Sequence, residues 1–304
     1  MDMGPVLTQM GILVFIMAVG FVCTKIGVTD QEFTRSSSKV VLNVFLVFTI
    51  LNSVTTAELE LSFSDLGADM LIYCVMLIIP AIIGLLGAKL LRMDAARGGI
   101  AAFSVCFTNT VFVGFPLVEA VYGAEGLLLA TISNIPYNII VYTLGIAMID
   151  GDVKSMNIKN ALSAPLISTV IAVGFFMTGW KLPGPVIECL DVISGGTVPV
   201  SMLIVGSSLG AMSIKKALGD WRVYMVCFLK LIIAPVVCFF VLKPFVHDEI
   251  LLGVIVILSA CPTATLATIL AIRSGKDEAY ASQCVFASTV FSAVTIPLMI
   301  WLLL

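Results

Sequence analysis

The sequence predicts an all-α membrane protein with ten transmembrane helices, arranged as two inverted halves of five, with one interrupted helix in each half. The first observation is composition: of 304 residues, 60% are hydrophobic and only 12% are charged. Soluble domains carry about 25% charged residues. The mean hydropathy is +1.14. The other two observations are the spacing of apolar stretches and the distribution of Lys and Arg.

Composition also excludes several classes of function. A net charge of −3 leaves no basic face for phosphates, so a nucleic-acid partner is excluded. The eight cysteines are scattered without CxxC spacing, which predicts small apolar helix residues and neither disulfides nor a metal site. No Ser/His, paired Asp or HExxH constellation occurs, so the chain is not expected to be an enzyme or to need a cofactor.

Charges and turn residues divide the chain into ten apolar stretches of about 20 residues, the length that crosses a bilayer. Their expected limits are 5–26, 37–55, 66–91, 98–121, 125–149, 161–180, 193–213, 221–243, 249–272 and 279–304. The seventh is the least regular because Gly195, Gly196 and Pro199 interrupt its start, which leaves 185–194 open as a short interfacial helix.

The basic residues predict the orientation in the cell (inner) membrane. Of the 16 Lys and Arg residues, 13 fall on one side of the predicted spans, whereas Lys181 and Lys243 fall on the other. Cytoplasmic loops carry the excess of Lys and Arg. The central loop 150–160 is therefore expected in the cytoplasm, with both termini outside. Removing one span would mix the basic loops between the two sides, which supports the count of ten.

Five spans in 1–149 and five in 161–304 make two halves of odd span number, so the second half must be inverted relative to the first. Gly123-Ala124-Glu125-Gly126 and Gly275-Lys276-Asp277-Glu278 follow the fourth and ninth spans at an offset of 152 residues. This offset places Cys261 and Pro262 opposite Asn109 and Thr110, at the centres of the two spans.

Polar and helix-interrupting residues gather at these two centres. Free backbone groups at membrane depth are tolerated only in a protein interior or a wet cavity. Helix N-termini that point into such a cavity carry partial positive charge and suit a carboxylate. The predicted substrate-binding residues are Thr108, Asn109, Thr110, Cys261, Pro262, Thr263 and Thr265, and the predicted helix breaks are at Gly114, Pro116 and Pro262.

At these residues the sequence resembles the auxin efflux carrier family, which includes PIN carriers and bacterial malate or malonate permeases. The motifs are Asn109-Thr110-Val111-Phe112-Val113-Gly114-Phe115-Pro116-Leu117, Ala260-Cys261-Pro262-Thr263-Ala264, and the small-residue run around Val205-Gly206-Ser207-Ser208-Leu209. The resemblance implies crossed, unwound helices 4 and 9, a scaffold of helices 1, 2, 6 and 7, and a moving unit of helices 3–5 and 8–10. It implies elevator-like transport of organic anions. The short central loop favours the bacterial type, and Asp69 matches an Asp that the family often has early in span three.

One cation lies deep within a predicted span. Lys230 stands eight residues beyond Arg222, about 12 Å along a helix, and such a charge is costly unless it faces a cavity or a partner. Lys230 and Asp69 are therefore candidates for charge support of an anionic substrate. Uniport and coupling to a proton or sodium are both left open, as are a homodimer, a sodium-coupled bile-acid-type symporter of similar fold, and an anion channel.

Overall fold

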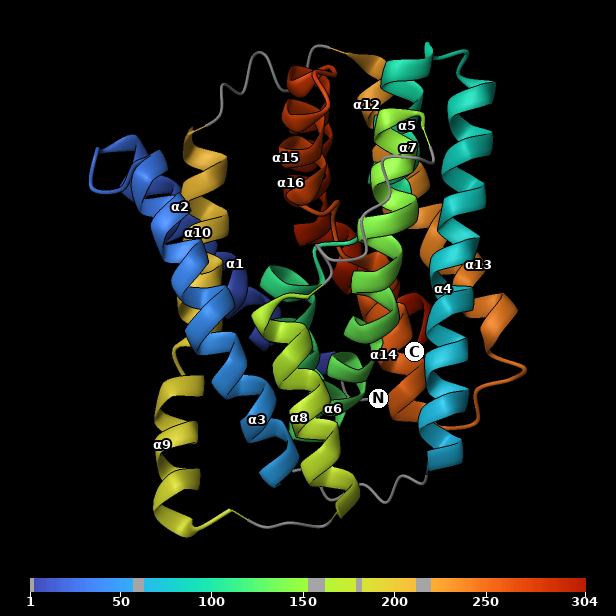
Figure 1. Ribbon diagram of the computed structural model, residues 1–304. Coiled ribbons are helices and arrows are strands. Elements are labelled where there is room, and N and C mark those ends of the chain that lie inside the picture. Colours follow the sequence, from blue (N-terminus) through green and yellow to red (C-terminus); the bar gives the residue numbers. More distant parts are fainter. Residues whose placement is uncertain (1–2, 57–62, 153–161, 179–181, 212–219) are drawn as a thin grey trace.

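The computed structural model describes residues 3–56, 63–152, 162–178, 182–211 and 220–304 (Figure 1). Regular structure in these residues is helical, apart from one isolated antiparallel bridge between Thr108 and Thr263. The predicted all-α class is confirmed. Most of the predicted central loop, 150–160, lies outside the described residues.

The first half of the chain begins with α1 (Met3–Lys25), followed by a continuous rod that contains a π-helical turn. This rod comprises α2 (Gln31–Val40), η1 (Val41–Phe45) and α3 (Leu46–Thr56). The Asp30 carboxylate accepts the Phe33 N–H and starts the rod. The remaining elements are α4 (Phe63–Leu90), α5 (Ala95–Cys106), η2 (Thr110–Gly114), α6 (Phe115–Ile140), η3 (Val141–Gly145) and α7 (Ile146–Asp150).

The second half repeats this alternation of long and interrupted helices. Its elements are α8 (Ala164–Thr178), α9 (Gly184–Ser194), α10 (Thr197–Ala211), α12 (Trp221–Phe228), η6 (Leu229–Ile233), α13 (Ala234–Leu242), α14 (Glu249–Ala260), α15 (Leu266–Arg273) and α16 (Glu278–Leu303). The helix α9 is separate from α10, so the seventh predicted span begins after a distinct short helix and not at 193.

Among the described residues, six helical stretches are long and apolar enough to cross a membrane, and four shorter apolar helices accompany them. The longest stretch, Thr110–Asp150, has 41 residues. Gly123 divides it, because its φ of 63° and ψ of −152° interrupt α6. The predicted boundary between the spans 98–121 and 125–149 falls at this glycine.

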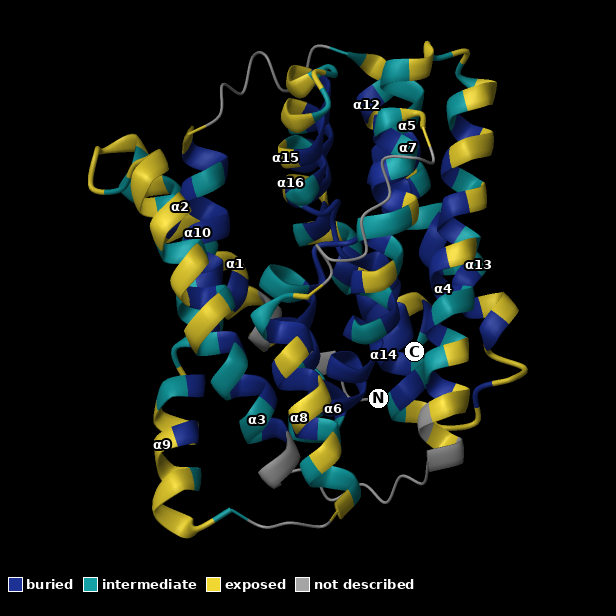
Figure 2. Ribbon diagram, in the orientation of Figure 1, coloured by how far each residue is buried: buried dark blue, intermediate teal, exposed yellow. Residues whose placement is uncertain are grey.

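Many large apolar side chains are exposed on the outside of the molecule, as a bilayer requires, and Figure 2 shows where the exposed parts of the helices lie. On α4, for example, Leu71, Ile78 and Ile82 are more than half exposed. The most buried helices are instead α5 and α14: residues 100–106 of α5 and 253–260 of α14 are buried throughout. Both helices end in the protein interior, and these internal ends position the candidate site.

The closest helix packing joins α1 to α10, where glycine allows backbones to touch. A Cβ on Gly206 would collide with the Met17 carbonyl oxygen, and one on Gly20 with the Leu203 carbonyl oxygen. The Ser207 hydroxyl donates to the Gly20 carbonyl oxygen over 3.2 Å. Gly210 packs in the same way, because a Cβ there would also crowd α1.

Candidate functional site

The two interrupted helices meet and complete each other's hydrogen bonding. After α5 ends, Phe107 is extended, and Cys261 is extended after α14. The Asn109 N–H donates to the Pro262 carbonyl oxygen over 2.7 Å, and the Ala264 N–H donates to the Phe107 carbonyl oxygen over 3.0 Å. Backbone groups that would be unpaired at the two breaks therefore pair with each other, which non-helical backbone inside a membrane protein needs.

Hydrogen bonds to three helices hold this bridge in place. The Thr263 hydroxyl donates to the Ser104 carbonyl oxygen of α5 over 2.9 Å, and the Thr263 N–H donates to the Ser288 hydroxyl of α16 over 3.1 Å. The Tyr137 hydroxyl of α6 donates to the Thr108 carbonyl oxygen over 2.7 Å. Thr108 and Thr263 are almost completely buried. The bridge is thus a buried junction, and the hydroxyl of Thr108 is left without a hydrogen-bond partner in the described structure.

Asn109 also restarts the helix after the first break. Its side-chain oxygen accepts the Phe112 N–H over 3.3 Å, so it caps η2. The predicted breaks at Gly114 and Pro116 are wrong in position, because the interruption covers residues 107–109 and both lie in the helix that follows. Pro116 lacks the N–H that an α-helical turn needs, and the Phe115 N–H bonds the Thr110 oxygen instead, which makes the π turn.

The second restart is less strongly capped. Thr265 occupies the cap position of α15, and its side chain makes no capping hydrogen bond. Gly114 lies close to the other break, since a Cβ there would come 2.7 Å from Leu258 Cδ2 and 3.5 Å from the Cys261 sulfur. The residues from Thr108 to Thr110 and from Cys261 to Thr265 therefore surround one junction, where η2 and α15 begin.

The predicted offset of 152 residues holds for two glycines but not for the bridge. Gly123 and Gly275, at the predicted offset of 152, both have positive φ, 63° and 61°. The bridge, however, relates Thr108 to Thr263, an offset of 155. The predicted pairing of Asn109 and Thr110 with Cys261 and Pro262 is therefore shifted by three residues, because the segment between break and glycine is shorter in the second half.

Lys230 lies inside the π turn η6, which forms because Pro235 has no N–H for an α-helical bond and the Ala234 N–H bonds the Leu229 oxygen. Lys230 is completely buried, and its Nζ has no hydrogen-bond partner in the described part of the chain. The groups that act on it electrostatically are the thiols of Cys106, Cys238 and Cys261.

These neighbours place Lys230 beside the candidate junction. Cys106 is the last residue of α5, and Cys261 caps the C-terminal end of α14. Each helix end offers a cation at most about 2 kcal/mol, whereas an unpaired buried ion costs several kcal/mol. The two helix ends therefore do not compensate for the cost of burying a charged Lys230 without a counter-ion.

The predicted second charge, Asp69, does not join this group. It is buried on α4, and the charges that act on it are Asp65 and Asp248, whose carboxylates would repel an anion. Among the predicted site residues, the structure therefore brings Lys230 to the junction through Cys261 and leaves Asp69 in a separate acidic environment.

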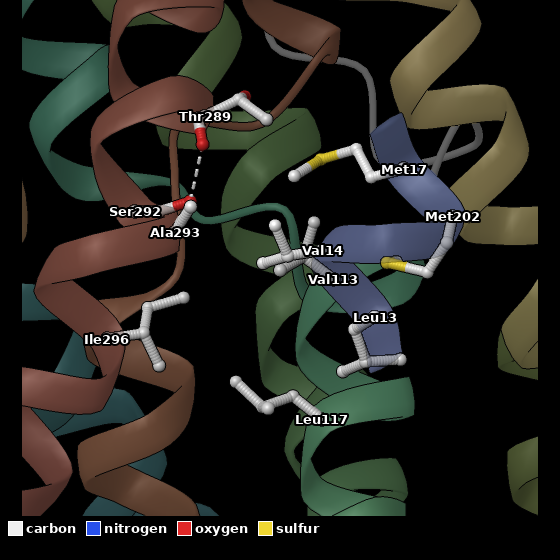
Figure 3. Close-up of a pocket in the computed structure, with 10 residues that line it drawn as sticks. All are labelled: Leu13, Val14, Met17, Val113, Leu117, Met202, Thr289, Ser292, Ala293 and Ile296. Carbon is white, nitrogen blue, oxygen red and sulfur yellow. Dashed lines mark hydrogen bonds between the residues drawn. The ribbon is translucent and has the colours of Figure 1, made fainter. Parts of the chain in front are cut away.

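An apolar cavity of about 40 Å³ borders the junction (Figure 3). It lies between α1 and α10 on one side and η2, α6 and α16 on the other; Val113 of η2 and Thr289 of α16 line it. The hydroxyls of Thr289 and Ser292 donate within their own helix, to the carbonyl oxygens of Val285 and Thr289. The cavity therefore presents a mainly apolar surface.

Sequence reasoning missed Tyr137, Ser288 and this cavity. Ser288 belongs to a group of polar residues within the apolar stretch 279–304, and this group is the sequence feature that points to it. Tyr137 had none, since its partner Thr108 lies 29 residues away in the sequence.

Comparison with known proteins assigns the chain to a family. The model of the family described as "Membrane transport protein" matches residues 5–161 and 152–300. An uncharacterized transporter of Methanothermobacter thermautotrophicus is 27% identical over 97% of both chains. An uncharacterized transporter of Methanocaldococcus jannaschii is 25% identical over 96% of this chain and 97% of its own. The uncharacterized transporter YfdV of Escherichia coli is 24% identical over 95% of each. The chain belongs to the membrane transport protein family, to which the auxin efflux carriers that its motifs resemble are assigned.

Proposed function

We propose that this transporter is a secondary carrier of small organic anions with a carboxylate group, and that it binds them at the junction of the two broken helices. The observation that carries the proposal is the buried, unpaired Lys230 beside the paired breaks at Thr108 and Thr263. Helix N-termini, together with an amine that can accept a proton and on which only thiols act among the described residues, favour a negatively charged ligand.

The binding groups divide into those already engaged and those free for a ligand. The hydroxyl of Thr263 is bonded to Ser104, so its role is to hold the junction. The Thr108 hydroxyl is unpaired. We assign carboxylate binding to Thr108, the amide of Asn109 and the first N–H groups of η2 and α15, with Thr110, Cys261, Pro262 and Thr265 shaping the site.

We propose that the fold is a ten-span, inverted 5+5 repeat that works by an elevator-like motion. The scaffold consists of α1, α2–α3, α8 and α9–α10, and the moving unit of the remaining helices. The contact of α1 with α10 and that of α3 with α8 are equivalent under this repeat, which supports the arrangement. The cavity lies where the two units meet, so a ligand there is carried past the scaffold.

The cavity also bears on the class of acid. Its lining offers no charged group to a second carboxylate, and burying an unpaired charge is unfavourable. Acids with one carboxylate and a compact apolar remainder are therefore expected to bind better than dicarboxylates.

Uptake into proteoliposomes tests the proposal, with labelled lactate, 2-oxoisovalerate, phenylacetate and malonate as probes. We expect saturable uptake and counterflow of at least one monocarboxylate. Absence of flux for every acid contradicts the proposal. Uptake that requires sodium supports a symporter of the bile-acid type, and flux without saturable counterflow supports a channel.

A further inference from the structure

We propose that Lys230 is the proton carrier of this transporter: the empty site holds a neutral amine, and binding of a carboxylate brings a proton to Nζ, so that anion and proton cross together. This inference rests on the proposed function and adds the coupling ion and the residue that carries it. It starts from the geometry of one side chain, whose ammonium would otherwise have no counter-charge.

The surroundings of Lys230 contain no group that would keep it charged. Its side chain is completely buried, and Nζ has no hydrogen-bond partner among the described residues. The groups that act on it are three thiols: Cys106 from α5, Cys261 after α14, and Cys238 from α13. The other helices packed against η6, which are α4, α12 and α16, contribute none of these groups. A buried amine without an anion is favoured in its neutral form.

The thiols do not serve as permanent partners. The Cys106 sulfur donates to the Leu77 carbonyl oxygen and the Cys238 sulfur to the Met76 carbonyl oxygen, both on α4. Because each is engaged as a thiol, neither presents a thiolate to Lys230. Cys106 and Cys261 lie at the C-terminal ends of α5 and α14, whose carbonyl groups carry only partial negative charge.

A bound carboxylate changes this balance. The carboxylate and the ammonium form an ion pair of zero net charge, which is far cheaper to move through a membrane interior than either ion alone. The proton comes from water on the side of loading and returns to water when the anion leaves. A monocarboxylate would therefore be carried with one proton and no net charge.

The experiment measures initial rates in proteoliposomes with the monocarboxylate that the panel above identifies, with the membrane potential clamped by potassium and valinomycin. For wild type we expect faster uptake with an inward proton gradient, and no change when the potential alone is varied. Lys230→Arg keeps a permanent positive charge, so we expect its residual uptake to ignore the proton gradient and to respond to the potential. Lys230→Met should lose anion uptake, and Lys89→Gln, on the exposed part of α4, should behave as wild type.

A second measurement does not depend on flux. Purified wild-type protein at pH 9 should take up protons as the anion binds, up to one per anion, detected with a pH indicator in weak buffer, and Lys230→Arg should take up none. Size-exclusion chromatography confirms that the variants are folded. Uptake of the acid with no response to the proton gradient, or the same coupling in wild type and Lys230→Arg, overturns the inference while leaving the proposed function intact. No flux of any acid overturns the proposed function instead.

Discussion

The backbone N–H of Asn109 donates to the carbonyl oxygen of Pro262 over 2.7 Å, and this hydrogen bond joins the interruption in the first half of the chain to that in the second. Asn109 supplies the N–H donor of this bond, and Pro262 supplies the carbonyl acceptor. Pro262 has no N–H and breaks α14, while Asn109 uses its N–H across the junction and its side chain to cap η2. A change at Asn109 therefore acts on both the restart of a helix and the site at the junction.

We expect Asn109→Ala to abolish anion binding while the protein still folds. Loss of the cap costs about 1 kcal/mol, which the buried core around α5 and α14 tolerates, but the amide also leaves the site. Thermal shift with the transported acid and uptake in proteoliposomes measure the two effects.

Asn43→Ala is the matched control, because the Asn43 amide bonds only the Lys39 carbonyl oxygen of its own helix. Normal uptake by Asn109→Ala would contradict the assignment of the junction as the binding site.

Thr263→Val should destabilise the junction, although the valine side chain has nearly the same size as that of threonine. The Thr263 hydroxyl is the donor to the Ser104 carbonyl oxygen, and leaving that buried group unpaired costs about 1–3 kcal/mol. Thr263→Ser should restore the bond and most of the stability. Thermal unfolding in detergent checks this against Thr178→Val, where the hydroxyl is exposed and bonds its own helix. Equal unfolding temperatures for Thr263→Val and wild type would refute this role.

Because α1 and α10 pack with their backbones in contact, one methyl group added between them should destabilise the protein strongly. Gly206→Ala should destabilise the protein by about 1–3 kcal/mol or more, since the added Cβ meets the Met17 backbone, which cannot rotate away. Gly174→Ala on α8 has open space around it and should be neutral or stabilising. Thermal unfolding of the two variants compares them directly, and an unchanged Gly206→Ala would show that the helices separate easily.

Local chemistry explains why the sequence predicted the helical class and the two breaks. Asn109 and Pro262 stand out because they are polar or helix-breaking residues in the middle of apolar runs. Gly123 and Gly275 share a motif, and both have the positive φ that glycine adopts without strain. Each of these predictions depends on a few neighbouring residues, which a sequence displays directly.

The errors arise where the outcome depends on contacts between distant segments. Gly114 and Pro116 are helix-disfavouring residues, but η2 runs directly into α6 across them, because the π turn accommodates the missing N–H of Pro116. Ser288 and Tyr137 support the junction only because α16 and α6 pack beside it. Lys230 was expected to face a cavity or a partner, and the thiols that act on it electrostatically come from three separate segments.

Filling the cavity should weaken binding of the bulkier acids first. Ala293 lines the cavity, so Ala293→Leu is expected to reduce affinity for phenylacetate about tenfold or more, in line with the effect of misfitting methylene groups in apolar pockets. Lactate should be less affected. Val294→Leu is the control, because Val294 is 72% exposed on the outer face of α16. Competition against the labelled acid in proteoliposomes gives both affinities, and equal effects on the two acids would place the apolar part of the ligand elsewhere.

The orientation can be tested with two single cysteines in a background that carries Cys189→Ser, which removes the exposed native thiol. His247 is exposed in the turn between α13 and α14, and Glu278 is exposed at the start of α16. The distribution of Lys and Arg predicts that the first turn is outside and the second is cytoplasmic. A membrane-impermeant maleimide should therefore label His247→Cys in intact cells, and Glu278→Cys only after lysis. The reverse pattern would place the basic loops outside and would overturn the predicted orientation.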